Sequence, residues 1–196
     1  MQVFSSLSDP VISKLLLSGK VGVIPTDTTY GIVTLASNRS AVTRLYLLKT
    51  RQHKPGTVVA YDIDQLVELG VPRRYLKANQ DFWPNPISVE IRLGDKLSYL
   101  HQATGRMAFR IPADQGLANL LKITGPLLTS SANLPAEPVA STTAQAQAYF
   151  GEQVDFYVDG GDLSSRLPST IIRIIDAAID VVRPGAVRID EYGNIR

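Results

Sequence analysis

Cysteine is absent from this sequence of 196 residues, and histidine occurs only twice. The absence of cysteine excludes disulfide bonds, a thiolate nucleophile and a cysteine-bound zinc ion. His53 and His101 stand in unrelated segments and do not suggest a histidine-rich metal centre. We therefore predict no metal site built from protein side chains, so catalysis has to rest on other groups.

Long hydrophobic runs are also missing. No stretch approaches the roughly 20 apolar residues that cross a bilayer, and Lys14 interrupts the apolar run 11–17. The first residues lack the basic and then apolar pattern of a secretion signal. These features predict a cytoplasmic protein that makes no contact with a membrane.

The composition is that of an ordinary globular domain, with 44% hydrophobic and 19% charged residues. This length is enough for one domain and short for two, so we predict a single domain over residues 1–196. The formal net charge of +2 is too small to indicate a nucleic-acid-binding protein by itself. A local concentration of arginine and lysine could still bind phosphates.

Short apolar runs alternate with helical patterns, so we predict a sheet whose strands alternate with helices. Asp9, Ser40 and Asp62 each precede a helical pattern and are predicted to cap a helix. The predicted helices include 11–18, 117–122 and 143–150. The predicted strands are 21–24, 32–35, 57–61, 87–93, 107–111, 126–129 and 156–158, followed by a hairpin of 170–175 and 179–183.

The loop 25–31 follows a buried strand and carries three hydroxyls, one carboxylate and one phenol. Open α/β sheets commonly hold their ligands at such strand ends, which indicates a binding loop. The alternative is a turn whose hydroxyl side chains satisfy their own backbone.

Lys49 and Arg51 stand where a predicted helix ends, and Lys54 adds a third positive charge nearby. A guanidinium offers a planar fork to phosphate oxygens and an ammonium offers a compact charge, so this group suits a triphosphate. The alternative is a set of cations that is favourably placed at the C-terminus of a helix.

Short polar side chains close the later strands. Ser131 and Asn133 could hold phosphate or ribose, or could form a simple turn. Ser169 and Arg183 also stand at strand ends, where ordinary turns are the alternative. No nucleophile elbow surrounds a serine, and no Walker A or Gly-x-Gly-x-x-Gly pattern is present.

Taken in order, these segments resemble the YrdC-like family. The resemblance rests on the loop 25–31, the Lys-x-Arg pair Lys49 and Arg51, the Ser-x-Asn pair Ser131 and Asn133, and segments 168–171 and 183–185. It spans nearly the whole chain. Each motif is short, but five of them occur in the order that is typical of the family.

The resemblance implies an α/β fold in a single domain, with a twisted mixed sheet and flanking helices around a basic cavity. It also implies synthesis of threonylcarbamoyl-AMP and pyrophosphate from L-threonine, bicarbonate and ATP, with Mg²⁺ on the phosphates. The expected ATP-binding residues are Lys49, Arg51, Ser131, Asn133 and Arg183, of which Lys49 and Arg51 would be catalytic. Thr28, Arg110, Thr129 and Ser169 would surround threonine.

The implied enzyme is a nucleotidyltransferase whose product passes to a separate tRNA threonylcarbamoyl transferase, for the N6-threonylcarbamoyladenosine modification of tRNA. A contact with tRNA or double-stranded RNA is a further implied partner. We expect Lys49 and Arg51 on a solvated cavity wall, so that alanine at either position abolishes turnover and leaves the fold intact.

Some positions depart from the family pattern. The segment 52–56 is one residue shorter than usual, Arg106 replaces a small or hydroxylated residue, and Glu137 brings a negative charge near the expected phosphates. These departures leave open a divergent YrdC-like paralogue that binds RNA or a nucleotide without synthase activity. A module that handles carbamoyl-AMP, as in hydrogenase maturation proteins, fits less well because the accompanying domains are not seen.

Overall fold

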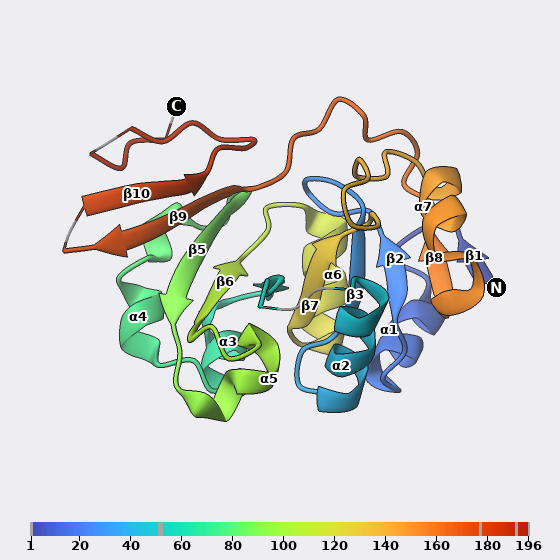
Figure 1. Ribbon diagram of the computed structural model, residues 1–196, viewed down its shortest axis with the longest axis horizontal. Coiled ribbons are helices and arrows are strands. Elements are labelled where there is room, and N and C mark those ends of the chain that lie inside the picture. Colours follow the sequence, from blue (N-terminus) through green and yellow to red (C-terminus); the bar gives the residue numbers. More distant parts are fainter. Residues whose placement is uncertain (1, 51–52, 177, 191, 196) are drawn as a thin grey trace.

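The computed structural model describes residues 2–50, 53–176, 178–190 and 192–195, and a mixed β-sheet runs through it (Figure 1). The strand order is β1-β8-β2-β3-β7-β4-β6-β5-β9-β10. The strands are β1 (Gln2–Phe4), β2 (Gly22–Ile24), β3 (Gly31–Leu35), β4 (Thr57–Val59), β5 (Ile87–Arg92), β6 (Arg106–Arg110), β7 (Leu127–Ser131), β8 (Phe156–Val158), β9 (Thr170–Ile175) and β10 (Ala178–Arg183). The predicted α/β fold with a mixed sheet is confirmed.

Helices connect most of these strands. They are α1 (Pro10–Leu17), α2 (Arg39–Leu48), α3 (Ile63–Leu69), α4 (Arg73–Lys77), α5 (Ser98–His101), α6 (Gln115–Thr124) and α7 (Thr143–Phe150), with short 3₁₀ turns at Gln80–Phe82, Asp95–Leu97 and Gly151–Gln153. No helix within the described ranges is both long and apolar enough to span a membrane.

The helix caps explain where the helices begin. The side chains of Asp9 and Asp62 accept hydrogen bonds of 2.9 Å from backbone amides in the first turns of α1 and α3, as predicted. The prediction that Ser40 caps α2 is wrong. Asn38 is the cap, because its side chain accepts from the amide of Ala41 at 3.1 Å, and the Ser40 hydroxyl donates to that same side chain.

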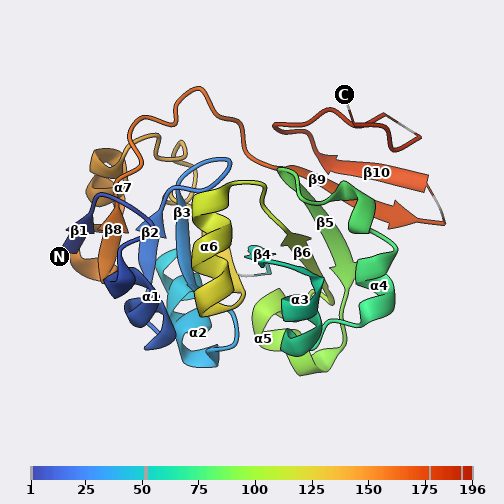
Figure 2. The same cartoon turned by 180° about the vertical axis from the view of Figure 1, so that it is seen from behind.

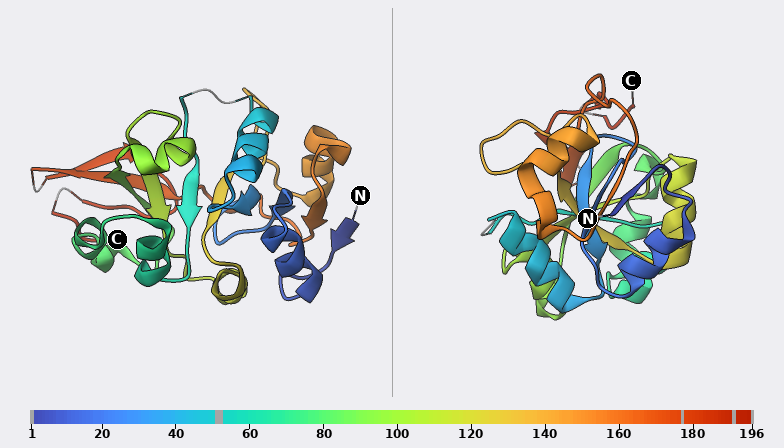
Figure 3. Two further views of the ribbon diagram at one scale, coloured as in Figure 1. Left: turned by 90° about the horizontal axis from the view of Figure 1, so that it is seen from below. Right: turned by 90° about the vertical axis from the view of Figure 1, so that its right-hand side faces the viewer.

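Two apolar cores lie on opposite faces of the sheet. Residues of α1 and α6 pack against one face, and residues of α2 and α7 belong to the core on the other face. Figure 3 shows these two pairs of helices on opposite sides of the strands, and Figure 2 shows α1 and α6 side by side. The helices therefore cover both faces of this half of the sheet.

Three central strands change from apolar to polar along one face. Val33, Val59 and Leu127 belong to the core under α1 and α6. Gly31, Thr57 and Thr129 lie on the same face, each two residues along its strand from one of these core residues. All three line a cavity. The apolar core thus continues directly into the floor of a polar pocket.

The β9–β10 hairpin closes the far end of the sheet and confirms the predicted hairpin. Strand β9 pairs with β5 over three residues only, from Thr170 to Ile172. Figure 1 shows β5 and β9 meeting at one end and then diverging. The hairpin therefore joins the sheet at its root, where Ser169 and Arg183 lie.

Candidate functional site

A cavity of about 230 Å³ lies where β3, β4, β6, β7 and the root of the β9–β10 hairpin meet. It brings together six of the nine residues that the sequence predicted: Thr28, Arg110, Thr129, Ser131, Ser169 and Arg183. All four residues expected around threonine are among them. We call this space the first cavity.

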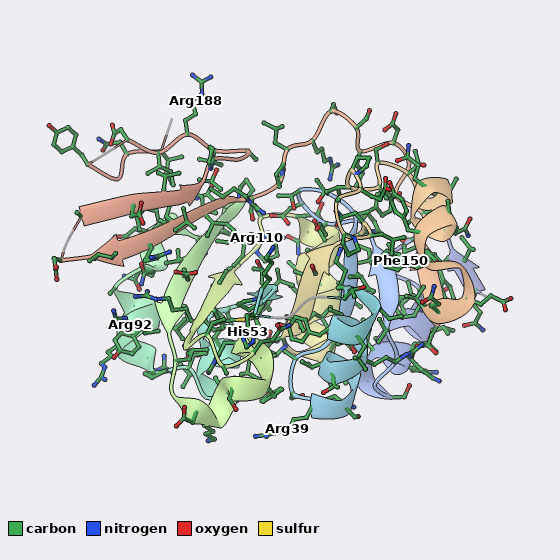
Figure 4. All side chains as sticks on the ribbon, viewed as in Figure 1. Arg39, His53, Arg92, Arg110, Phe150 and Arg188 are labelled. Carbon is green, nitrogen blue, oxygen red and sulfur yellow. The ribbon has the colours of Figure 1, made fainter. Side chains whose placement is uncertain are left out.

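Arg110 forms a buried ion pair at the wall of the first cavity. Its Nη2 atom lies 2.9 Å from Oδ1 of Asp27, and the two side chains are 4% and 7% exposed. Burial raises the pKa of the Asp27 carboxyl above its ordinary value, although Arg110 favours the ionised form. Burial likewise lowers the pKa of Arg110, and Asp27 opposes that shift. Figure 4 places Arg110 near the centre of the molecule, between β6 and β7.

The Arg110–Asp27 pair keeps unused hydrogen-bonding capacity. Nε of Arg110 and Oδ2 of Asp27 are buried, and neither has a hydrogen-bond partner among the described residues. Buried polar atoms without partners are rare and costly, so they mark a place where a ligand could complete the bonding. A guanidinium edge suits the carboxylate of a small molecule.

The root of the hairpin supplies a second guanidinium. Nη2 of Arg183 donates hydrogen bonds to the carbonyl of Ser169 at 2.7 Å and to its hydroxyl oxygen at 3.2 Å. The hydroxyl of Ser88 on β5 donates to the same hydroxyl oxygen at 2.9 Å. These bonds fix the hairpin against β5 and hold Ser169 at the cavity wall.

The loop between β2 and β3 satisfies part of its own backbone and also lines the cavity. The hydroxyl of Thr26 accepts from the amide of Thr28 at 3.1 Å and donates to the carbonyl of Thr29 at 2.7 Å. Thr26, Thr28 and Thr29 all line the first cavity. The hydrogen bonds within the loop confirm the turn that was one alternative, and the binding role of the loop stays a prediction.

A second cavity of about 440 Å³ lies at the end of α2. It is lined by Lys49, Thr50, Lys54, Asn133, Leu134, Pro135 and Ala136. Lys49 and Asn133 belong to the expected ATP-binding set. Ser131 belongs to the same set but lines the first cavity. The predicted nucleotide residues that the structure describes are thus divided between two cavities, with Ser131 and Arg183 at the first and Lys49 and Asn133 at the second.

Lys49 is buried, which corrects the prediction that it stands on a solvated wall. Its side chain ammonium donates to the carbonyl of Ser131 at 2.8 Å, to Oδ1 of Asn133 at 2.7 Å and to the carbonyl of Asn133. The residue is 3% exposed. The sequence placed Lys49 correctly at the end of a helix, but it gave no sign that the segment after β7 folds over the ammonium.

The other residues noted in the sequence have mixed outcomes. Arg51 lies outside the described residues, and so does Gln52. Arg106 lies 3.8 Å from Glu90 as an ion pair. Glu137 is exposed, and its carbonyl accepts a hydrogen bond of 2.7 Å from the side chain of Asn133.

Asp27 and Glu90 are two functional candidates that sequence reasoning did not select. Asp27 stood within a recognised loop, and a carboxylate between hydroxyls could have suggested a buried ion pair. Glu90 alternates with the buried residues Val89 and Ile91 of β5, so its place on the polar face could have been inferred. No group of three His, Cys, Asp or Glu side chains that could hold a metal occurs within the described ranges.

Gly56 should be indispensable to the floor of the first cavity. A Cβ atom at this position would lie 2.3 Å from the carbonyl oxygen of Thr129, which belongs to the backbone of β7. We expect Gly56→Ala to lose about 1–3 kcal/mol of stability, as measured by chemical denaturation. Gly94→Ala is the matched control, because nothing lies within 4 Å of its added Cβ. Equal stability of the two variants would contradict the close approach of Gly56 to β7.

Comparisons with known proteins agree on one family. Residues 14–185 match the model of the Sua5, YciO and YrdC family, which is described as "Telomere recombination". A Mycobacterium tuberculosis relative, provisionally named threonylcarbamoyl-AMP synthase, is 32% identical over 183 residues, which cover 91% of this chain and 84% of the relative. The threonylcarbamoyl-AMP synthase of Pseudomonas aeruginosa is 28% identical over 190 residues, which cover 93% of this chain and 100% of that protein.

A solved structure shows the same fold. The crystal structure of P. abyssi Sua5 complexed with L-threonine matches with a TM-score of 0.83 at 21% identity. The match covers 95% of this chain and 58% of the P. abyssi chain. The two chains therefore share the same fold.

Proposed function

The chain belongs to the Sua5, YciO and YrdC family, and on that premise we propose that it is an L-threonylcarbamoyladenylate synthase. This enzyme is a nucleotidyltransferase that forms threonylcarbamoyl-AMP and pyrophosphate from L-threonine, bicarbonate and ATP. The observation that carries the proposal is the first cavity, which gathers every residue expected around threonine.

Threonine would occupy the first cavity. The free Nε edge of Arg110 suits its carboxylate, since a guanidinium and a carboxylate form strong, directional hydrogen bonds. Thr28, Thr129 and Ser169 would supply hydroxyl groups to the remaining polar atoms. The likeness to a P. abyssi protein that was solved with L-threonine supports threonine as a ligand of this chain.

ATP would approach from the second cavity, with its phosphates toward the end of β7. Lys49, Arg51 and Arg183 would offset the negative charge, and Ser131 and Asn133 would offer short donors and acceptors. Because the Lys49 ammonium already binds Ser131 and Asn133, its first role is to shape the segment that meets the nucleotide.

The chemistry requires two anions to react. The amine of threonine and bicarbonate form a carbamate, and an oxygen of this carbamate attacks the α-phosphorus of ATP and displaces pyrophosphate. The protein would hold both anions in reacting geometry and reduce their repulsion, a task that suits Lys and Arg side chains. No covalent intermediate with the protein is needed.

Mg²⁺ would enter as part of the ATP complex. Its preferred ligands are oxygens, and substrate phosphates commonly supply them. This fits a site whose described residues include no cluster of three carboxylate or histidine side chains. Mg²⁺ would thus be bound mainly by the nucleotide.

The wider role follows from the product. Threonylcarbamoyl-AMP is an activated intermediate, so a separate tRNA threonylcarbamoyl transferase would consume it. Both steps would take place in the cytoplasm. This chain would also be a candidate for direct contact with tRNA or double-stranded RNA. A single domain over residues 1–196 and a basic cavity remain part of the proposal. Arg106 gives little support to an RNA-binding paralogue without synthase activity, because it already faces Glu90.

The proposed function predicts release of pyrophosphate that depends on threonine. The purified protein would be incubated with ATP, Mg²⁺ and bicarbonate, and L-threonine would be compared with L-serine and with no amino acid. We expect release with threonine and little with the controls. Binding of ATP or RNA without any release would contradict the synthase and favour the paralogue.

A further inference from the structure

The first cavity contains a negative charge that the proposed residue set does not use. Among the described residues that line it, Glu90 is the only one with a carboxylate. The set expected around threonine consists of three hydroxyls and one guanidinium. None of these carries a negative charge for the α-ammonium group of a free amino acid.

The register of the sheet brings Glu90 close to Arg110. In the antiparallel pair of β5 and β6, Glu90 is directly opposite Ala108. Its diagonal neighbours on the same face are therefore Arg106 and Arg110, at a typical distance of about 7–8 Å between Cα atoms. A small molecule with one positive and one negative group could contact Glu90 and Arg110 together.

One carboxylate oxygen of Glu90, Oε2, forms ion pairs with two arginines, although it is buried and has no hydrogen-bond partner among the described residues. Oε2 lies 2.6 Å from Nε of Arg173 on β9 and 3.8 Å from Nη1 of Arg106. No hydrogen bond within the described part of the chain reaches Oε1 of Glu90. The side chain is 20% exposed, and Glu90 lines both the first cavity and a neighbouring pocket that Arg92 and Arg106 also line.

We propose that Glu90 binds the α-ammonium group of the amino-acid substrate through Oε1 and accepts its proton. This proposal rests on the proposed function and adds to the same site a group that recognises the amine. Arg110 would take the carboxylate and Glu90 the ammonium, so the cavity would select free α-amino acids.

The proton transfer balances the first step of the reaction. The ammonium gives one proton to the Glu90 carboxylate, which leaves a neutral amine. The amine nitrogen then attacks the carbon of bicarbonate, the C–N bond forms, and the bond from carbon to the hydroxyl group breaks. Hydroxide takes the second amine proton and leaves as water, so the products are the carbamate, water and protonated Glu90.

The test compares two ligands on two proteins by calorimetry. L-threonine carries the ammonium, and (2S,3R)-2,3-dihydroxybutanoate carries a hydroxyl group in its place. We expect the wild-type protein to bind threonine about tenfold more tightly or better, and Glu90→Gln to lose most of that preference. Glu90→Asp, which keeps the charge on a shorter side chain, should recover part of it.

Two control variants separate this role from a structural one. Glu68→Gln, at an exposed position on α3, should keep the wild-type preference. Asp27→Asn acts through Arg110 and should reduce the binding affinity for both ligands by the same factor, because both carry a carboxylate.

The outcomes distinguish the inference from the proposed function. If Glu90→Gln keeps the full preference for threonine while the wild-type protein releases pyrophosphate, the proposed role of Glu90 is wrong and the proposed synthase function is supported. If the wild-type protein binds neither ligand and releases no pyrophosphate, both are wrong. Loss of the preference in Glu90→Gln alone supports the inference.

Discussion

Replacing Lys49 by methionine should remove turnover and also destabilise the protein by about 3 kcal/mol. The substitution keeps much of the side chain volume but removes the ammonium that donates to the carbonyls of Ser131 and Asn133, and it leaves Oδ1 of Asn133 with the Ser131 hydroxyl as its remaining side-chain donor. An unsatisfied buried acceptor costs about 1–3 kcal/mol. Chemical denaturation would measure the loss, and pyrophosphate release should fall by about a hundredfold or more because the segment after β7 loses its shape.

Lys54→Met is the matched control for Lys49→Met. Lys54 lines the same second cavity but is exposed, so its replacement should change stability by less than about 0.5 kcal/mol. If both lysine variants are equally stable, the buried position of Lys49 is wrong and the solvated wall expected from the sequence is right.

Replacing Arg110 by methionine should have the largest effect on stability, about 3–5 kcal/mol at neutral pH. The variant leaves the Asp27 carboxylate buried without its counter-ion, and breaking one half of a buried ion pair has a cost of this order. Binding of threonine should be lost as well, because its carboxylate partner is gone. Denaturation curves and calorimetry with threonine would measure the two effects.

The loss of stability caused by Arg110→Met should increase as the pH rises from acid to neutral. Burial already raises the pKa of Asp27, and removing Arg110 takes away an interaction that lowers it, so the pKa rises further in the variant. When a group has a raised pKa in the folded state, the folded protein loses stability as the pH rises through that pKa. The difference in stability between wild type and variant should therefore be small in acid and grow toward neutral pH.

A double variant provides the control for this ion pair. Asp27→Asn together with Arg110→Met removes both charges, so it should be more stable than Arg110→Met alone near neutral pH. A difference in stability that does not change with pH would show that Asp27 is not the source of the effect.

The sequence predicted most strands and helices because their signals are local. The caps at Asp9 and Asp62 and the alternation in 87–93 can be read from a few neighbouring residues. The edge strand β1 was missed because three residues at one end of a chain give no periodicity. Its pairing with β8, about 150 residues away, is a tertiary contact.

The site was predicted as a set of residues, but not as a set of contacts. Thr28, Arg110, Thr129 and Ser169 line one cavity, with Arg110 and Ser169 at strand ends, Thr129 within β7 and Thr28 in the loop between β2 and β3. The ion pair of Arg110 with Asp27 and the burial of Lys49 depend on segments more than 80 residues apart. Spacing along the chain carries no information about such partners, so neither the counter-ion of Arg110 nor the burial of Lys49 could be predicted.

The end of β7 serves both cavities at once. Ser131 lines the first cavity, while its carbonyl accepts a hydrogen bond from the Lys49 ammonium and its hydroxyl donates to Asn133, both of which line the second cavity. A ligand that shifts this short segment from one side changes the binding surface on the other. Such a linkage is reciprocal, so any factor by which nucleotide raises the affinity for threonine must equal the factor by which threonine raises the affinity for nucleotide.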